Sequence, residues 1–93
     1  MHRILSVGID PSLLKTRQAL LAANGYDCEI AMPGDAEEKL NSGNFDLVIL
    51  SAMLSHDEKR HIQARIPAAT RPLVLETLVW PKELLSLVSK ALV

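Results

Sequence analysis

The stretch FDLVILSAML, residues 45–54, reads as a strand that runs into a loop. Its four consecutive apolar residues, Leu47 to Leu50, are typical of a strand that is buried on both faces, as in a parallel sheet. We expect the strand to cover residues 45–52, with Ser51 where it ends. Parallel strands are joined by helical crossovers, so the flanking sequence should alternate strands with helices.

The first part of the chain meets this expectation. A short apolar run over residues 3–8 predicts a strand. Residues 10–25 predict a helix, with Asp10 as the N-cap and Pro11 at the first helical position. Leucines at helical spacing mark its buried face, and we place Arg17 at the edge of that leucine stripe.

The next segment alternates apolar and polar residues from 26 to 32, which favours a strand with one face less buried, as at a sheet edge. Its Cys28 is interpreted as a small core residue. Residues 34–43 then predict a short helix, where Asp35 and Glu38 resemble a capping box.

The part of the chain after Ser51 predicts two more helices and one strand. Ser55 and Glu58 form another capping-box pattern, at the start of a helix over residues 56–66. Residues 71–79 predict the last strand, and residues 81–93 predict the last helix.

The order is therefore βα four times over, which predicts a three-layer α/β fold with a doubly wound parallel sheet, as one domain over residues 1–93. The chain has 93 residues, 48% of them hydrophobic and 3% aromatic, so its core must be aliphatic.

The net charge of −1 and the absence of a basic stripe argue against a nucleic-acid partner. A single cysteine excludes an intrachain disulfide, and no apolar run suits a signal peptide or membrane span. We expect a soluble, cytoplasmic protein with no membrane partner.

Three segments resemble the receiver domain of response regulators, the CheY-like fold of two-component signalling. ILSVGIDPSLL with NGYDCEIA, residues 4–14 and 24–31, resembles its opening strand, helix and second strand. FDLVILSAML resembles its third strand and the following loop. LVWPKELLSLVSKAL, residues 78–92, resembles its last strand and last helix.

The resemblance implies a phosphorylation site that this sequence does not complete. Receivers hold Mg²⁺ with two acidic residues after the first strand and an aspartate after the third strand, which accepts phosphate. The acidic pair falls on Gly8 and Ile9, and the acceptor position falls on Ser51. Asp10 matches the next position, and the family's phosphate-binding lysine is replaced by Trp80. Either Glu76 or Thr77 matches the hydroxyl position, and Pro81 follows as in the family.

A receiver has five βα units, whereas this chain has room for four. Either the fourth strand and helix are deleted, or the fourth and fifth strands are fused, and both alternatives predict the sheet order 2-1-3-4. The family's lysine–proline bond is usually cis, so we predict a cis bond between Trp80 and Pro81. The apolar stretch PLVLETLV would lie at a sheet edge, which suggests a homodimer through the last strand or the last helix.

We therefore expect a degenerate receiver, a pseudo-receiver of a bacterial signalling protein, that is not an enzyme and binds a protein partner without a metal or other cofactor. One alternative is a small ligand-binding or nucleotide-binding flavodoxin-like domain, although VGIDPS lacks a glycine-rich phosphate loop. A second is a fragment or an architectural part of an oligomer, with no ligand. Ser51 is interpreted as a structural loop residue, with a small-ligand contact or a site of regulatory phosphorylation as the alternatives. We expect Trp80 to pack over the strand end, and its alternative role is an exposed anchor for a partner. Asp57 and His61 have metal-ligand spacing, but a solvated helix face is the simpler interpretation.

Overall fold

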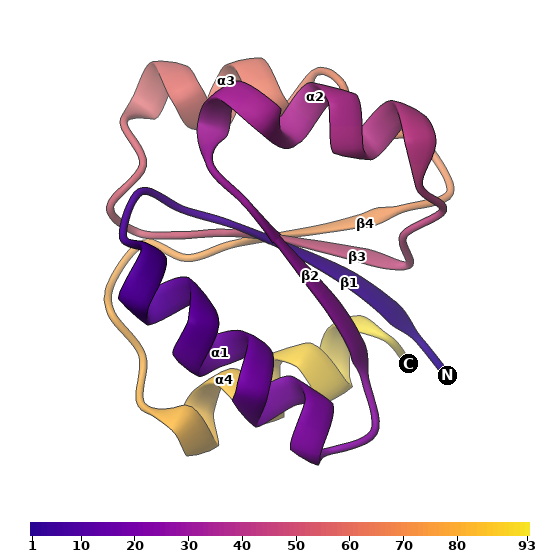
Figure 1. Cartoon of the computed structure of the whole chain (residues 1–93), viewed down its shortest axis with the longest axis vertical. Coiled ribbons are helices and arrows are strands. Elements are labelled where there is room, and N and C mark those ends of the chain that lie inside the picture. Colours follow the sequence, from indigo (N-terminus) through magenta and orange to yellow (C-terminus); the bar gives the residue numbers. More distant parts are fainter.

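Strands and helices alternate along the whole chain in the computed structural model, which describes all residues from 1 to 93 (Figure 1). The elements are β1 (Arg3–Val7), α1 (Pro11–Ala23), β2 (Asp27–Ala31), α2 (Pro33–Ser42), β3 (Leu47–Leu50), α3 (His56–Gln63), β4 (Arg71–Val74) and α4 (Pro81–Ala91). The predicted succession of four βα units is therefore confirmed.

The four strands form one parallel sheet in the order β2-β1-β3-β4, as predicted from the sequence. In the centre of the sheet, Val7 of β1 is in register with Leu50 of β3 and with Ala31 of β2. All four residues of β3 are buried. The apolar run that predicted a parallel sheet is thus the central strand with helices on both of its faces.

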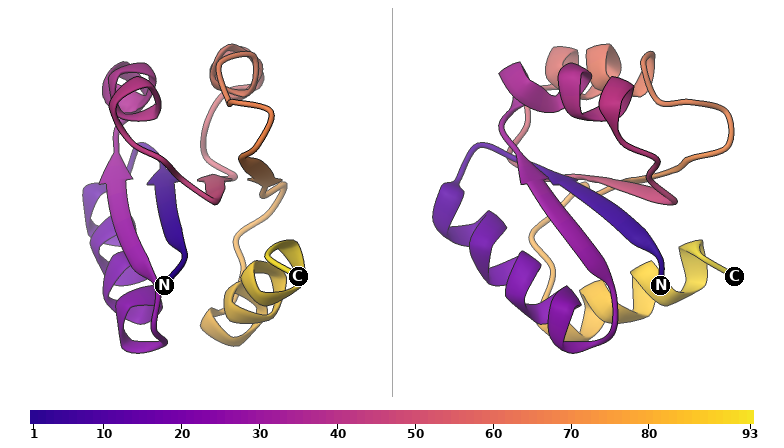
Figure 2. Two further views of the ribbon diagram at one scale, coloured as in Figure 1. Left: turned by 90° about the vertical axis from the view of Figure 1, so that its right-hand side faces the viewer. Right: turned by 45° about the vertical axis from the view of Figure 1, so that its right-hand side comes forward.

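Two helices cover each face of the sheet, giving the three predicted layers (Figures 1 and 2). The layer formed by α2 and α3 encloses one buried cluster, and the layer formed by α1 and α4 encloses the other. Side chains alternate along β3, so that Val48 and Leu50 enter the first cluster while Leu47 and Ile49 enter the second. The core is built almost entirely from aliphatic residues, as the composition requires.

The last strand is shorter than predicted, because its partner ends. Residues 71–79 were expected to be extended, but β4 covers only Arg71–Val74. The backbone N–H of Leu75 donates to the carbonyl of Leu50, the last residue of β3. Beyond that bond the sheet offers no further backbone partner, and the chain continues as a loop to α4.

The helix starts confirm two of the three predicted caps. The Asp10 carboxylate accepts hydrogen bonds from the backbone N–H groups of Ser12 and Leu13 at 3.0 and 3.3 Å, as an N-cap should. Ser55 and Glu58 form the predicted capping box, with bonds of 2.9 and 3.1 Å. Both are local interactions that need no distant partner, which explains why the sequence pattern predicted them.

The capping box predicted from Asp35 and Glu38 is wrong. Helix α2 begins at Pro33, two residues before Asp35, and its N-cap is Met32. The proline ring sets the backbone angle that a first helical residue requires, so the helix starts there. Asp35 consequently lies inside the first turn, where its charge faces the positive end of the helix dipole without capping it.

The cis bond predicted between Trp80 and Pro81 is also wrong, because all peptide bonds are trans. Trp80 has an extended backbone, with φ −70° and ψ 155°, and its carbonyl accepts the first helical bond from Leu84. An extended residue before proline and a proline at the first helical position are both favoured with a trans bond.

Candidate functional site

The chain leaves all four strands at the same edge of the sheet, on the left of Figure 1. Ligands of doubly wound sheets bind outside this carboxyl edge. The residues that the sequence analysis singled out are distributed over three of the loops at this edge. Gly8, Ile9 and Asp10 follow β1, Ser51 follows β3, and Glu76, Thr77 and Trp80 follow β4.

Gly8 and Ser51 face each other directly after the two central strands. The Ser51 N–H donates to the Val7 carbonyl at 3.0 Å, which extends the sheet pairing by one step. Both residues are buried. A Cβ built on Gly8 would stand 2.7 Å from Ser51 Oγ and 3.1 Å from Leu14 Cδ2. Neighbouring side chains have thus closed around the position where the receiver pattern has an acidic residue.

Arg17 is a residue of this candidate site whose predicted position is wrong. It was expected at the edge of the leucine stripe of α1, but it is only 4% exposed and lies on the helix face between the buried Leu14 and Leu21. Its Nη1 donates a hydrogen bond of 2.7 Å to Ser51 Oγ. The available signal was its spacing, because positions 14, 17 and 21 belong to one helix face.

The guanidinium of Arg17 lacks a carboxylate partner. The ion pairs of this protein involve other cations, and the only side-chain bond that Arg17 makes is the one to Ser51. Removal from water lowers the pKa of Arg17 from its ordinary value. The site therefore contains a buried cation next to the residue that matches the phosphoacceptor position.

Ile9 and Asp10, which follow Gly8 after β1, contribute no free carboxylate to this site. Ile9 is apolar and exposed, and the Asp10 carboxylate is engaged in capping α1. Asp10 therefore has the local role that the sequence predicted for it. Gly8 and Ile9 cannot coordinate a metal ion through their side chains.

The loop between β4 and α4 does not bring its predicted residues to Ser51. It leaves the sheet edge and runs beside the layer of α1 and α4 to the start of α4 (Figure 1). Trp80 is 76% exposed, so the expectation that it packs over the strand end is wrong. Glu76 points into solvent with Lys59 Nζ 3.9 Å away, and Thr77 is exposed. This loop follows the edge strand β4, so no further strand flanks it on its outer side.

The side chains at this edge do not fit Mg²⁺, the metal implied by the receiver resemblance. Mg²⁺ requires oxygen ligands, above all carboxylates. The position after β3 offers one hydroxyl, which already accepts a bond from a cation. Nowhere in the chain do three His, Cys, Asp or Glu side chains gather to share a metal ion. Asp57 and His61 are exposed, in agreement with the solvated helix face.

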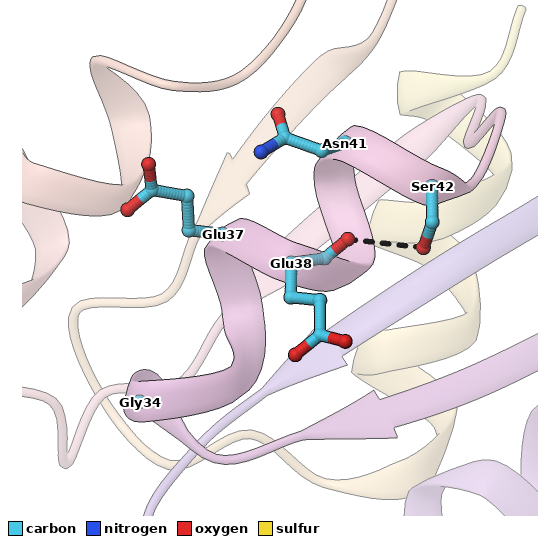
Figure 3. Close-up of a pocket in the computed structure, with 5 residues that line it drawn as sticks. All are labelled: Gly34, Glu37, Glu38, Asn41 and Ser42. Atoms are coloured by element: carbon cyan, nitrogen blue, oxygen red, sulfur yellow. Dashed lines mark hydrogen bonds between the residues drawn. The ribbon is translucent and has the colours of Figure 1, made fainter.

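The largest surface hollow lies away from this edge. It measures about 490 Å³ and lies on the outer side of α2, lined by Gly34, Glu37, Glu38, Asn41 and Ser42. Figure 3 shows the side chains leaving the helix in different directions, with Ser42 bonded to the Glu38 carbonyl at 3.0 Å. Glu37 pairs with Arg65 of α3 at 3.1 Å. These polar groups do not converge on a common point and form no binding site.

Solved structures with similar folds have the same architecture over nearly the whole chain. The chemotaxis protein CheY4 of Vibrio cholerae is 20% identical with a TM-score of 0.67, covering 98% of both chains. A CheY-like response regulator receiver domain protein of Methanospirillum hungatei is 20% identical with a TM-score of 0.71, covering 99% of this chain and 94% of its own. This chain has the fold of a response-regulator receiver domain.

A third receiver-like structure extends the comparison to a signalling complex. A chain in the structure of histidine kinase ThkA with response regulator protein TrrA is 24% identical, with a TM-score of 0.71 and full coverage of both chains. At the sequence level, no protein family and no curated protein matches significantly. The receiver fold is thus shown by structure, with four βα units in place of the five that the resemblance implied.

Proposed function

We propose that this chain is a degenerate receiver domain that does not take up phosphate on an aspartate and acts as a protein–protein interaction module in two-component-type signalling. The observation that carries the proposal is the contact between Arg17 and Ser51. The acceptor position holds a buried hydroxyl bonded to a cation, where phosphoryl transfer requires a carboxylate with Mg²⁺. The domain is accordingly no enzyme and needs no cofactor.

Exposed apolar side chains on the loops of the carboxyl edge support the interaction role. Ile9, Met53, Leu78 and Trp80 are exposed, and they lie in the loops after β1, β3 and β4. Leu78, Val79 and Trp80 line a surface hollow of about 320 Å³ that contains no charged residue. Exposed apolar side chains that share one hollow, as on the β4–α4 loop, are typical of surfaces that bind another protein.

The cellular setting and the assembly are further parts of this proposal. We propose a cytoplasmic domain of a bacterial signalling protein. Separately, none of the helices has the length and hydrophobicity of a membrane span. If the domain forms a homodimer, α4 is the better candidate for the contact, since Leu85, Leu87 and Leu92 are only partly covered. The outer edge of β4 contains Pro72, which offers no backbone N–H to a partner strand.

Phosphorylation chemistry can be tested directly on the wild-type chain. The protein is incubated with Mg²⁺ and acetyl phosphate and analysed by mass spectrometry, and in parallel with beryllofluoride by NMR. We expect no added phosphoryl mass and no shift of the amides around Ser51. A stoichiometric aspartyl adduct would contradict the proposal, and a canonical receiver run alongside shows that the reagents are active.

The interaction role is tested with the only tryptophan of the chain. Because Trp80 is exposed, its fluorescence should report the binding of a protein to the β4–α4 loop. The products of neighbouring genes, beginning with histidine kinases and output domains, are titrated against wild type and against Leu78→Ser. We expect a blue shift that Leu78→Ser weakens and Val93→Ser, a change at another exposed apolar residue, does not. Equal binding by both variants would exclude this loop as the interface.

A further inference from the structure

Ser51 is held at three points. Its N–H donates to the Val7 carbonyl at 3.0 Å, and its own carbonyl accepts from the N–H of Leu54 at 3.2 Å. Its Oγ accepts from Arg17 Nη1 at 2.7 Å, which is the side-chain bond that ties the loop after β3 to α1. Two of the three bonds are backbone bonds that any residue could make, whereas the third depends on Arg17.

The burial of Arg17 destabilises the fold unless the guanidinium gains interactions that compensate for its lost hydration. Arginine stays protonated in proteins, and a buried cation without an acidic partner loses its hydration. The bond to Ser51 Oγ is charge-assisted, and such bonds are stronger than neutral ones. With Gly8 lacking a Cβ, Ser51 Oγ can approach, and the three residues together fill the space at the ends of β1 and β3.

We propose that Arg17 blocks this former acceptor site. Its guanidinium holds Ser51 and residues 52–54 in place, and it occupies the position that a metal-bound phosphoryl group would need. Arg17 of α1 blocks the site by itself, and the β4–α4 loop takes no part. A carboxylate introduced at position 51 would therefore pair with Arg17, and restoring the acidic residue alone would leave the site closed to Mg²⁺ and phosphodonors. This inference rests on the proposed function, because both interpret residue 51 as a former acceptor.

The first test measures native-state amide exchange in Arg17→Met, with Lys15→Met as the matched control. Lys15 is exposed on the same helix and makes no ion pair. A lost hydrogen bond from a charged group changes a local equilibrium by about tenfold or more. We expect the Leu54 amide of Arg17→Met to exchange about tenfold faster relative to the amides of β1, and the control to match wild type.

A merely structural role for Arg17 would produce a different pattern. In that case all amides that exchange through global unfolding would lose protection together, and the ratio of Leu54 to β1 would not change. That result overturns the proposal. If Arg17→Met does not fold, the wild-type protein still provides a test. Its Arg17 guanidinium protons should exchange slowly with water, as measured by NMR. Exchange as fast as in free arginine overturns the proposal.

The second test introduces the acid itself. In Ser51→Asp, the pKa of the introduced carboxyl should fall below its ordinary value, because a cation lies within contact. Adding Arg17→Met should raise that pKa above the ordinary value, because the acid is then buried without a partner. Beryllofluoride with Mg²⁺ should leave the single variant Ser51→Asp unchanged.

The two proposals fail in distinguishable ways. A phosphoryl adduct on the wild-type chain contradicts the proposed function, whatever Arg17 does. An ordinary or raised pKa in Ser51→Asp, or beryllofluoride bound to it, overturns the closing role of Arg17 and leaves the wild-type chemistry as proposed.

Discussion

Gly8 and Ser51 lie so close at the ends of β1 and β3 that a Cβ on Gly8 would stand 2.7 Å from Ser51 Oγ and 3.2 Å from Ser51 Cβ. Real Cβ atoms essentially never approach a neighbour to 2.7 Å. Glycine is therefore required at position 8 by packing, since its backbone angles are ordinary. The absence of a side chain at position 8 and the inward position of Ser51 are thus two parts of one arrangement.

We predict that Gly8→Ala destabilises the protein by about 1–3 kcal/mol, the usual cost of overpacking a filled core. Urea unfolding followed by circular dichroism measures the change. Gly34→Ala is the matched control, because a Cβ at Gly34 of α2 meets no atom within 4 Å. That substitution should stabilise the helix by about 0.5–1 kcal/mol.

A double-mutant cycle tests whether the stability lost in Gly8→Ala comes from the contact between the new Cβ and Ser51. Ser51→Gly removes both Ser51 atoms that the new Cβ would approach. The double variant should therefore lose less stability than the sum of the two single variants. Strict additivity would show that the strain lies elsewhere, for instance at Leu14 Cδ2, 3.1 Å from the built Cβ.

The two capping patterns of the sequence provide a second prediction. Ser55→Ala should cost about 1 kcal/mol, because it leaves the Glu58 N–H without the Ser55 hydroxyl that accepts its bond. Asp35→Ala at the other pattern should cost only about 0.3–1 kcal/mol, since Asp35 interacts with the helix dipole alone. Thermal unfolding of both variants checks this, and a larger loss for Asp35→Ala would restore the cap that the sequence suggested.

Pro72 protects the open edge of the sheet. The Arg71 N–H donates to the carbonyl of Asp46 just before β3, and the Leu75 N–H donates to the carbonyl of Leu50 in β3. By alternation, the backbone nitrogens of Pro72 and Val74 face outward. We predict that Pro72→Thr, which adds an outward N–H and a residue suited to strands, promotes association through β4. Light scattering after size-exclusion chromatography should show a larger mass for Pro72→Thr, while Pro67→Thr, outside the strand, stays like wild type.

Cys28 supplies a pH dependence. Burial, with smaller contributions from Asp27 and Glu29, raises the pKa of the Cys28 thiol from 9.0 to about 11. In the unfolded chain the thiol ionises first, so the folded state binds more protons between these two values. Stability from this group is therefore fully present below about pH 9 and is lost as the pH rises toward about 11.

Urea unfolding of wild type and Cys28→Ala across that range isolates the effect. The stability of wild type should fall relative to the variant by an amount of the order of 2 kcal/mol. The native thiol should also react slowly with alkylating reagents at neutral pH, because the thiolate is the reactive form. Parallel stability curves for the two proteins would contradict the raised pKa.

Much of the fold was predictable because its signals are local. The run Leu47–Leu50 can be apolar throughout only if both faces of its strand are buried, which predicted the parallel sheet with helices on both sides. Asp10 and Ser55 cap helices through bonds to residues within three positions. The predictions were wrong where the structure depends on residues far away in the sequence. The end of β4 is set by the end of β3, and the exposure of Trp80 depends on what surrounds its loop.

The sequence by itself determined the order of elements, the sheet order and the absence of carboxylates at Gly8, Ile9 and Ser51. Only the tertiary structure decided what replaced them. An arginine in a leucine stripe can extend to solvent or be buried, because its long stem suits either environment. Burial requires an acceptor for the guanidinium, and that acceptor is Ser51, 34 residues further along the chain. The pairing exists only once the carboxyl end of β3 has been brought under α1.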